Sequence, residues 1–296
     1  MRDFFVSTKQ GRVFAVKNEF KPSRETVLFI HGYPDDYRSW EYQLPFFADD
    51  YNILAINLPG VGESYSPAKQ SDYHVDVVHE IIIELIDEVS PGKKIHLVGH
   101  DWGALLSWGI VSDKKYASRI QSYTAISGPH PAIARQNLFQ KLFRKAPHQV
   151  EEALDQLTRS WYMFFFQLPF LPELLWNFFP RQLMNKVLEK SQLPLYDPMY
   201  NHSADETKSK VLKPLGLYRE LVLGRPALVP EKVYSPVQVI IPQEDAMIAP
   251  SIYDNLGQYA PSAVTRRLHG NHWIHREKPE EVNKYLRSFF EENSYL

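Results

Sequence analysis

Short apolar segments that end at turn residues alternate with segments of helical periodicity in the first part of this chain. The apolar segments have the length of buried strands and lie at 27–31, 51–58, 94–100 and 120–127. Between two of them, residues 75–89 repeat apolar positions at spacings of three and four, which predicts a helix. Strands that alternate with helices favour an α/β fold with a mostly parallel sheet flanked by helices. Residues 2–8 and 11–18 indicate a leading hairpin.

The alternation stops near residue 129. Residues 130–229 have helical and aromatic patterns without a clear strand. The alternation then resumes, with two strand-like runs and a closing helical pattern at 237–242, 263–270 and 278–292. We therefore expect a core of residues 1–129 and 230–296, interrupted by an all-helical cap of residues 130–229.

Composition excludes several classes of function. The chain has 296 residues, 44% of them hydrophobic, which is enough for a sizeable core. Its 33 Lys and Arg against 35 Asp and Glu give a net charge of −2 without a basic stripe, so we expect no nucleic-acid partner. The absence of cysteine excludes disulfides, thiol catalysis and zinc–thiolate sites. No H-E-x-x-H pattern occurs among the 11 histidines, so we expect no metal and no cofactor.

Two features bear on membranes. The N-terminal MRDFFVSTKQGR has no apolar signal-peptide region, which favours a cytoplasmic protein. Residues 161–179, WYMFFFQLPFLPELLWNFF, approach the length of a membrane span, but Pro169, Pro172 and Glu173 would be costly in lipid. We expect no stable membrane insertion and interpret this segment as the aromatic wall of a ligand pocket. A membrane-touching or oligomer-forming surface, including a homodimer, is the second interpretation.

A turn between an apolar run and a helical run places one carboxylate at its centre. Residues 97–108 are LVGHDWGALLSW, with Asp101 between Gly99 and Gly103. In the related G-x-S-x-G pattern, a strained turn of this kind presents a nucleophilic serine. Asp101 is therefore a candidate nucleophile, kept ionised by the helix N-terminus. The alternative is that Asp101 simply caps the helix.

Further motifs come directly after other predicted strands. The functional sites of α/β folds usually lie at these strand ends. The stretch H-G-Y-P at 31–34 would present the N–H of Tyr33 beside Asp101, and the N–H groups of Tyr33 and Trp102 would then form an oxyanion hole. Asp245 and His272 follow the last two strands, and the order nucleophile, acid, histidine is the one expected for this fold.

Neighbouring residues compete for these roles. Glu244 is the competitor for the acid, and His269 and His275 are competitors for the base. We prefer His272 because it precedes Trp273 and the stretch that opens the final helix.

A carboxylate nucleophile suits a saturated carbon that carries a leaving group, because displacement gives an alkyl ester on the enzyme. His272, oriented by Asp245, would then activate water to attack that ester. Epoxides and alkyl halides both fit this chemistry. An epoxide oxygen needs a proton or strong donors, which tyrosine hydroxyls supply, whereas a halide needs donors only.

The chain resembles the α/β-hydrolase-fold epoxide hydrolases in H-G-Y-P, G-H-D-W-G, the late Asp245 and the H-W pair at 272–273. That resemblance implies an α/β-hydrolase fold, a helical cap and conversion of epoxides to vicinal diols without a cofactor. It also implies two cap tyrosines that activate the epoxide oxygen. Tyr162 in YMFFFQLP and Tyr218 in GLYREL match them.

The aromatic cap segment favours a small, apolar epoxide as substrate. We expect the substrate to contact five further residues near these motifs, namely His31, Pro34, Trp161, Phe165 and Trp273.

Two alternatives remain open. A haloalkane dehalogenase shares Asp101 and Trp102, but Tyr33 stands where a second halide donor is expected. A non-catalytic ligand receptor on the same fold would not need the complete set of nucleophile, acid and histidine.

Overall fold

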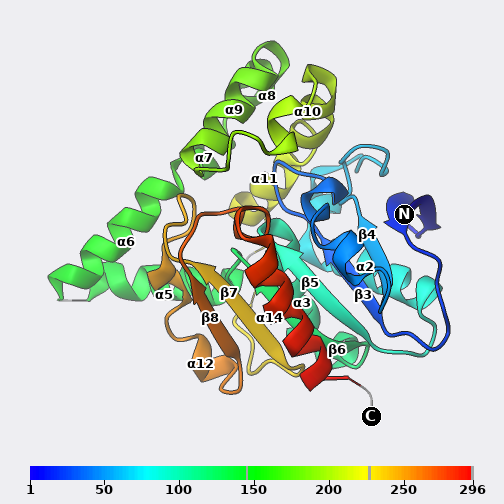
Figure 1. The fold of residues 1–296 in the computed structure, drawn as a ribbon. Helices are drawn as coiled ribbons and strands as arrows, with labels where there is room; N and C mark the ends of the chain where they lie inside the picture. The colour runs from blue at the N-terminus through cyan, green and yellow to red at the C-terminus, as the bar shows by residue number, and fades with distance from the viewer. Residues whose placement is uncertain (145, 226–227, 295–296) are drawn as a thin grey trace.

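The core of the protein is an eight-stranded sheet in the order β1-β2-β4-β3-β5-β6-β7-β8 (Figure 1). The structure, a computed structural model, describes residues 1–144, 146–225 and 228–294. Strands β1 and β2 form an antiparallel hairpin and β2 pairs antiparallel with β4, whereas the other neighbours are parallel. The strands are Arg2–Ser7, Arg12–Lys17, Thr26–Ile30, Asn52–Ile56, Ile95–His100, Ile120–Ile126, Val237–Pro242 and Val264–Leu268. The predicted α/β architecture with a mostly parallel sheet and the leading hairpin are confirmed.

Helices cover both faces of the sheet because its strands are apolar on both sides. In β3, Val27 and Phe29 pack in one core cluster with α14, and Leu28 and Ile30 pack in the other with α2 and α3. The core helices are α1 (Leu44–Phe47), α2 (Val75–Val89), α3 (Trp102–Ser112), α4 (Lys114–Ala117), α12 (Leu256–Tyr259), α13 (Ile274–Glu277) and α14 (Pro279–Glu292). Short 3-10 helices are η1 (Tyr37–Trp40), η2 (Gln70–Tyr73) and η4 (Pro250–Tyr253).

Between β6 and β7 the described residues form helices and no strand. These are α5 (Pro131–Phe143), α6 (Pro147–Arg159), α7 (Trp161–Phe165), α8 (Leu171–Phe178), α9 (Pro180–Lys190), η3 (Pro198–Asn201), α10 (Ala204–Val211) and α11 (Leu215–Leu223). Helices α7 to α10 stand together beyond the sheet, whereas α6 packs beside α5 to one side of them (Figure 1). We call the segment from α5 to α11 the cap.

The aromatic segment 161–179 does not form one continuous helix. It contains α7 and α8, separated by the turn that carries Pro169. Within the described residues, no helix combines the length and the apolar composition needed to cross a bilayer. The expected cytoplasmic location and the possible homodimer stay predictions.

The close approach of α3 to β3 requires glycine at position 103. A Cβ on Gly103 would lie 2.1 Å from the carbonyl oxygen of Ile30, which is backbone and cannot move aside. This contact fixes the helix that follows Asp101 against the sheet.

We therefore expect Gly103→Ala to lower the free energy of unfolding by about 1–3 kcal/mol through overpacking. Gly257→Ala is the matched control, because a Cβ there meets nothing within 4 Å. The control should leave the stability unchanged or raise it by up to about 1 kcal/mol. Urea denaturation of both variants measures the difference, and equal midpoints would contradict this account of the packing.

Candidate active site

Asp101 lies at the sharp turn between β5 and α3, with φ 49° and ψ −115°. Such a backbone is strained for a residue with a side chain and persists only where the surroundings impose it. The Asp101 side chain makes no capping hydrogen bond to α3, so the helix-cap interpretation is wrong. Instead, its Oδ1 accepts a hydrogen bond from the backbone N–H of Tyr33 at 2.8 Å.

The loop after β3 makes room for this carboxylate. A Cβ on Gly32 would lie 2.4 Å from the Cβ of Asp101, so glycine is required there. Tyr33 follows directly and aims its N–H at Asp101, as the sequence predicts for one oxyanion donor. Trp102, the other predicted donor, is the first residue of α3.

His272 lies between two carboxylates. Its Nδ1 is 3.0 Å from Oδ2 of Asp245, and its Nε2 is 3.5 Å from Oδ2 of Asp101. All three residues are at most 7% exposed. Backbone N–H groups of Met247 and Ile248 also donate to Asp245, which fixes that carboxylate. The structure thus brings together the three predicted residues.

The competing residues lie elsewhere. Glu244 accepts a hydrogen bond from the exposed His269 at 2.8 Å, on the surface of the protein. His275 is buried and its Nε2 meets the hydroxyl of Ser39.

The carboxylates control the protonation of His272. Burial lowers the pKa of the imidazole, but the charges and hydrogen bonds of Asp245 and Asp101 outweigh burial and raise it to about 10. Burial likewise raises the pKa of the Asp101 carboxyl, yet the hydrogen bond and charge of His272 outweigh it and lower the pKa below its usual value. At neutral pH the site therefore contains an imidazolium and an ionised Asp101.

Two residues that sequence reasoning missed hold the backbone of His272. Ser127 donates its hydroxyl to the carbonyl oxygen of His272 at 2.7 Å, and Nε2 of His100 donates to the same oxygen at 3.0 Å. Burial and the charge of His272 lower the pKa of His100 to about 4, so His100 stays neutral. The signal for His100 was its place beside Asp101 in G-H-D-W-G. Ser127 directly follows β6 and gave no motif.

A cavity of about 520 Å³ opens at Asp101 and Trp102 and extends under the cap. Its walls are largely apolar, with contributions from α5, α6, α7 and α11. They include Leu105, Leu138, Phe139, Leu157, Met163 and Leu221. Both predicted cap tyrosines, Tyr162 and Tyr218, line this cavity.

Aromatic rings fix Tyr218 in place. Its ring centroid lies 5.0 Å from that of Trp102, 5.1 Å from that of Tyr33 and 5.8 Å from that of Tyr162. Burial raises the pKa of both cavity tyrosines above the usual value, and the charge of Asp101 raises it further. Both hydroxyls are therefore protonated donors.

The five residues expected to contact the substrate do not line this cavity. His31 is buried and accepts a hydrogen bond from the N–H of Leu58 at 3.0 Å, and Trp273 is buried with Nε1 on Asp35. Pro34 is buried in the loop after β3. On α7, Trp161 is 57% exposed, and Phe165 stacks against it rather than facing the cavity. None of the five residues therefore lies where the sequence predicts a substrate contact. On α7 the reason is that adjacent positions of one helix point in different directions, whereas His31, Pro34 and Trp273 are buried in the packing of the loops.

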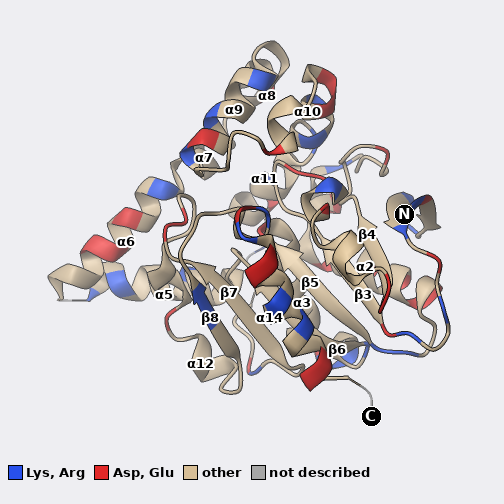
Figure 2. Cartoon of the chain, in the orientation of Figure 1, with Lys and Arg blue, Asp and Glu red and all other residues tan. Residues whose placement is uncertain are grey.

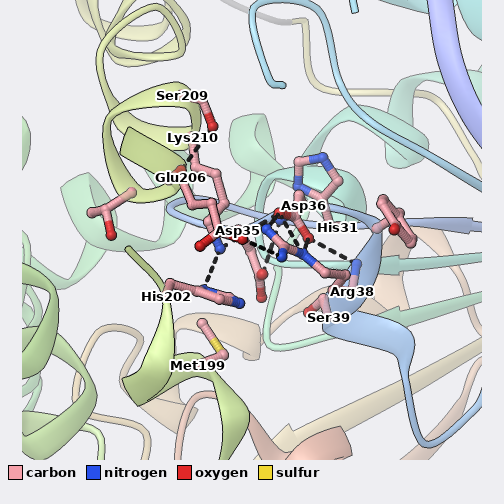
Figure 3. A network of polar contacts seen from close by, with 12 residues as sticks. His31, Asp35, Asp36, Arg38, Ser39, Met199, His202, Glu206, Ser209 and Lys210 are labelled. Atoms are coloured by element: carbon pink, nitrogen blue, oxygen red, sulfur yellow. Dashed lines mark hydrogen bonds and ion pairs between the residues drawn. The ribbon is translucent and has the colours of Figure 1, made fainter. Parts of the chain in front are cut away.

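Buried ion pairs tie the cap to the loops that carry Tyr33 and His272. In Figure 3, Lys210 of α10 lies 3.5 Å from Asp36, and its Nζ is 2.7 Å from Nδ1 of His202. Arg276, four residues after His272, meets Asp197 of the cap at 2.8 Å. Both cations are almost completely buried. Sequence reasoning assigned no role to any of the five residues of this network.

Among the described residues, no group of three or more potential metal ligands could hold an ion.

The fold and this site define a hydrolase of the alpha/beta hydrolase fold, and the chain belongs to that family, whose model matches residues 25–279. Epoxide hydrolase 3 of Xenopus tropicalis is 28% identical over 278 residues, which cover 90% of this chain and 71% of that relative. The crystal structure of Bacillus megaterium epoxide hydrolase with an inhibitor has a TM-score of 0.78 and 27% identity, and the match covers 97% of this chain and 100% of that one. The resemblance to epoxide hydrolases is thereby confirmed.

The protonation of His272 makes stability depend on pH. Its folded pKa of about 10 exceeds the usual value of 6.5, so its stabilising contribution is complete below pH 6.5 and is lost as the pH rises toward 10. We expect the unfolding free energy of the wild type to fall more steeply over this range than that of His272→Gln. His269→Gln, at an exposed histidine, should keep the wild-type slope. Urea denaturation at several pH values tests this, and equal slopes for all three proteins would refute it.

Proposed function

We propose that this protein hydrolyses epoxides to vicinal diols through an alkyl ester on Asp101. One observation carries the proposal: the buried, ionised Asp101 faces an apolar cavity that also contains two protonated tyrosines. The names of the two relatives described above support the same reaction.

In the first step, Oδ2 of Asp101 attacks an epoxide carbon and the carbon–oxygen bond of the ring breaks. The hydroxyl of Tyr162 or Tyr218 donates its proton to the oxygen that leaves. Oδ1, already held by the N–H of Tyr33, becomes the carbonyl oxygen of the ester. The Tyr33 N–H thus stands where negative charge develops when water attacks that carbonyl.

In the second step, His272 changes role because its surroundings change. Esterification removes the charge of Asp101, one of the two carboxylates that raise the pKa of His272. Transfer of the imidazolium proton to the tyrosinate leaves a neutral imidazole. That base accepts a proton from water as the water attacks the ester, and Asp245 stabilises the imidazolium that forms. Collapse of the tetrahedral intermediate breaks its bond to the alkoxide, which takes the proton of the hydroxyl that water added. The diol then leaves, and Asp101 is again ionised.

The leaving group distinguishes epoxide hydrolysis from dehalogenation. A departing halide needs no proton, whereas an epoxide oxygen does. The two tyrosine hydroxyls at the cavity therefore favour the epoxide. The apolar walls favour a small, apolar substrate.

A parallel assay tests the assignment directly. We expect the wild type to form diol from aryl and alkyl epoxides and to release no halide from haloalkanes of the same size. Asp101→Ala should abolish diol formation, because no other group supplies the nucleophile. Halide release without diol formation would indicate a dehalogenase instead. Formation of neither product would favour a ligand receptor.

His272→Gln should trap the ester, because this variant retains the nucleophile but lacks the base. Intact-mass spectrometry after mixing with epoxide should show an adduct of the substrate mass. The adduct should be absent from the double variant Asp101→Ala, His272→Gln. An unmodified His272→Gln protein together with normal turnover would reject the assigned base.

Tyr162→Phe and Tyr218→Phe should each slow ester formation, by about 10²-fold or more, because each removes a proton donor. Single-turnover measurements separate this step from ester hydrolysis, which should change less. Tyr196→Phe is the control, since Tyr196 is 81% exposed and lies outside the cavity. Unchanged ester formation in both cavity variants would remove the tyrosines from the mechanism.

A further inference from the structure

The cap has an apolar stripe on its outer surface that runs from α7 through α8. Its members follow one another at spacings of three or four residues, and each is between 41% and 68% exposed. They are Trp161, Phe164, Leu168, Leu171, Leu174 and Phe178, and we call them the outer stripe. Trp161 and Phe164 lie on α7, and Leu168 lies in the turn that follows. Leu171, Leu174 and Phe178 lie on α8, where spacings of three and four residues mark one helix face. In this protein that face is turned to the outside.

Helix α8 already packs against the cap through another face. Pro172 and Trp176 are buried there, so α8 has apolar residues on both its inner and its outer side. Phe170, just before α8, is 83% exposed and has φ 63°. A bulky residue in the left-handed region is strained, so the surrounding structure must hold the backbone of Phe170 in this conformation.

The outer stripe contains no unpaired charge. Glu173 is the one charged residue between positions 160 and 179, and its Oε1 lies 2.6 Å from a guanidinium nitrogen of Arg219. Arg219 thus balances the charge of Glu173 within the cap, so contact with an apolar phase would not strand an unpaired charge.

Basic residues lie on α9, the helix that follows the stripe. Arg181 and Lys186 of α9 are exposed, and basic positions are visible on α9 beside α8 in Figure 2. The outer stripe also adjoins the cavity, because Phe164 belongs to the stripe and lines the cavity. An apolar, aromatic face that is followed by a helix with exposed cations thus adjoins an apolar cavity.

We propose that the outer stripe and the basic residues of α9 bind the surface of an anionic phospholipid bilayer. Aromatic side chains such as Trp161 and Phe178 enter the region between headgroups and acyl chains, and Arg181 and Lys186 contact the phosphates. A symmetric dimer through the same face would bring the cations of two copies together, which like-charge repulsion disfavours. The binding does not depend on the proposed reaction.

Co-sedimentation with vesicles tests this inference on the complete chain. We expect the protein to bind vesicles of phosphatidylcholine with phosphatidylglycerol more tightly than vesicles of phosphatidylcholine alone. Because exposed charges are screened by salt, the preference should shrink as the ionic strength rises from about 0.1 M to about 1 M. The triple variant Phe170→Asn, Leu174→Gln, Phe178→Gln should bind about tenfold or more weakly. Asn suits position 170 because it tolerates the left-handed region.

A second variant keeps the test valid if the triple variant does not fold. Arg181→Glu with Lys186→Glu changes only exposed residues and should abolish the preference for anionic vesicles. Two matched controls change exposed residues outside the cap. Phe5→Gln with Phe46→Gln removes exposed aromatic rings, and Lys114→Glu with Lys284→Glu makes the same change in net charge. Both controls should bind as the wild type does.

Three results would overturn the inference. One is an absence of vesicle binding by the wild type, and another is equal binding by the wild type and both cap variants. The third is a wild-type dimer that light scattering shows to become a monomer in the triple variant, without vesicle binding. That result would assign the outer stripe to a second copy of the chain.

Discussion

A buried imidazole between two carboxylates is the interaction on which the rest of the site depends. His272 contacts Asp245 through one ring nitrogen and faces Asp101 with the other. An isolated charge at this depth would be very unfavourable, so each member of the group is stable only with the others present. Protonation of His272 and ionisation of Asp101 are therefore two aspects of one arrangement.

The sheet provides the rigid frame for this arrangement. Asp101, Asp245 and His272 follow β5, β7 and β8, so the ends of parallel strands bring together residues that are 171 positions apart in the chain. The turn at Asp101 is strained, and the close packing at Gly32 and Gly103 together with the Tyr33 N–H holds it. The fold thus spends stability to expose one carboxylate to the cavity.

Sequence reasoning predicted those parts of the protein whose structure is set by residues close together in the chain. The apolar runs predicted the strands because buried parallel strands are apolar on both faces. The turn at G-H-D-W-G predicted Asp101 because glycine spacing and turn geometry are local features of the sequence. The wall of the cavity was not predictable in this way. Trp161 and Tyr162 are neighbours of similar chemistry, but only Tyr162 reaches the cavity, because tertiary packing sets the rotation of α7.

The buried ion pairs between cap and core constrain how molecules enter and leave. Lys210 with Asp36 and Arg276 with Asp197 join the cap to the segments that follow Tyr33 and His272. A hinge movement of the whole cap would separate these charges in surroundings that water does not fully reach. The separation would therefore cost much free energy. Exchange of reactant and product is therefore left to side-chain rotation at the entrance. The reach of those side-chain rotations, rather than the swing of a lid, then limits the size of the molecules that can enter.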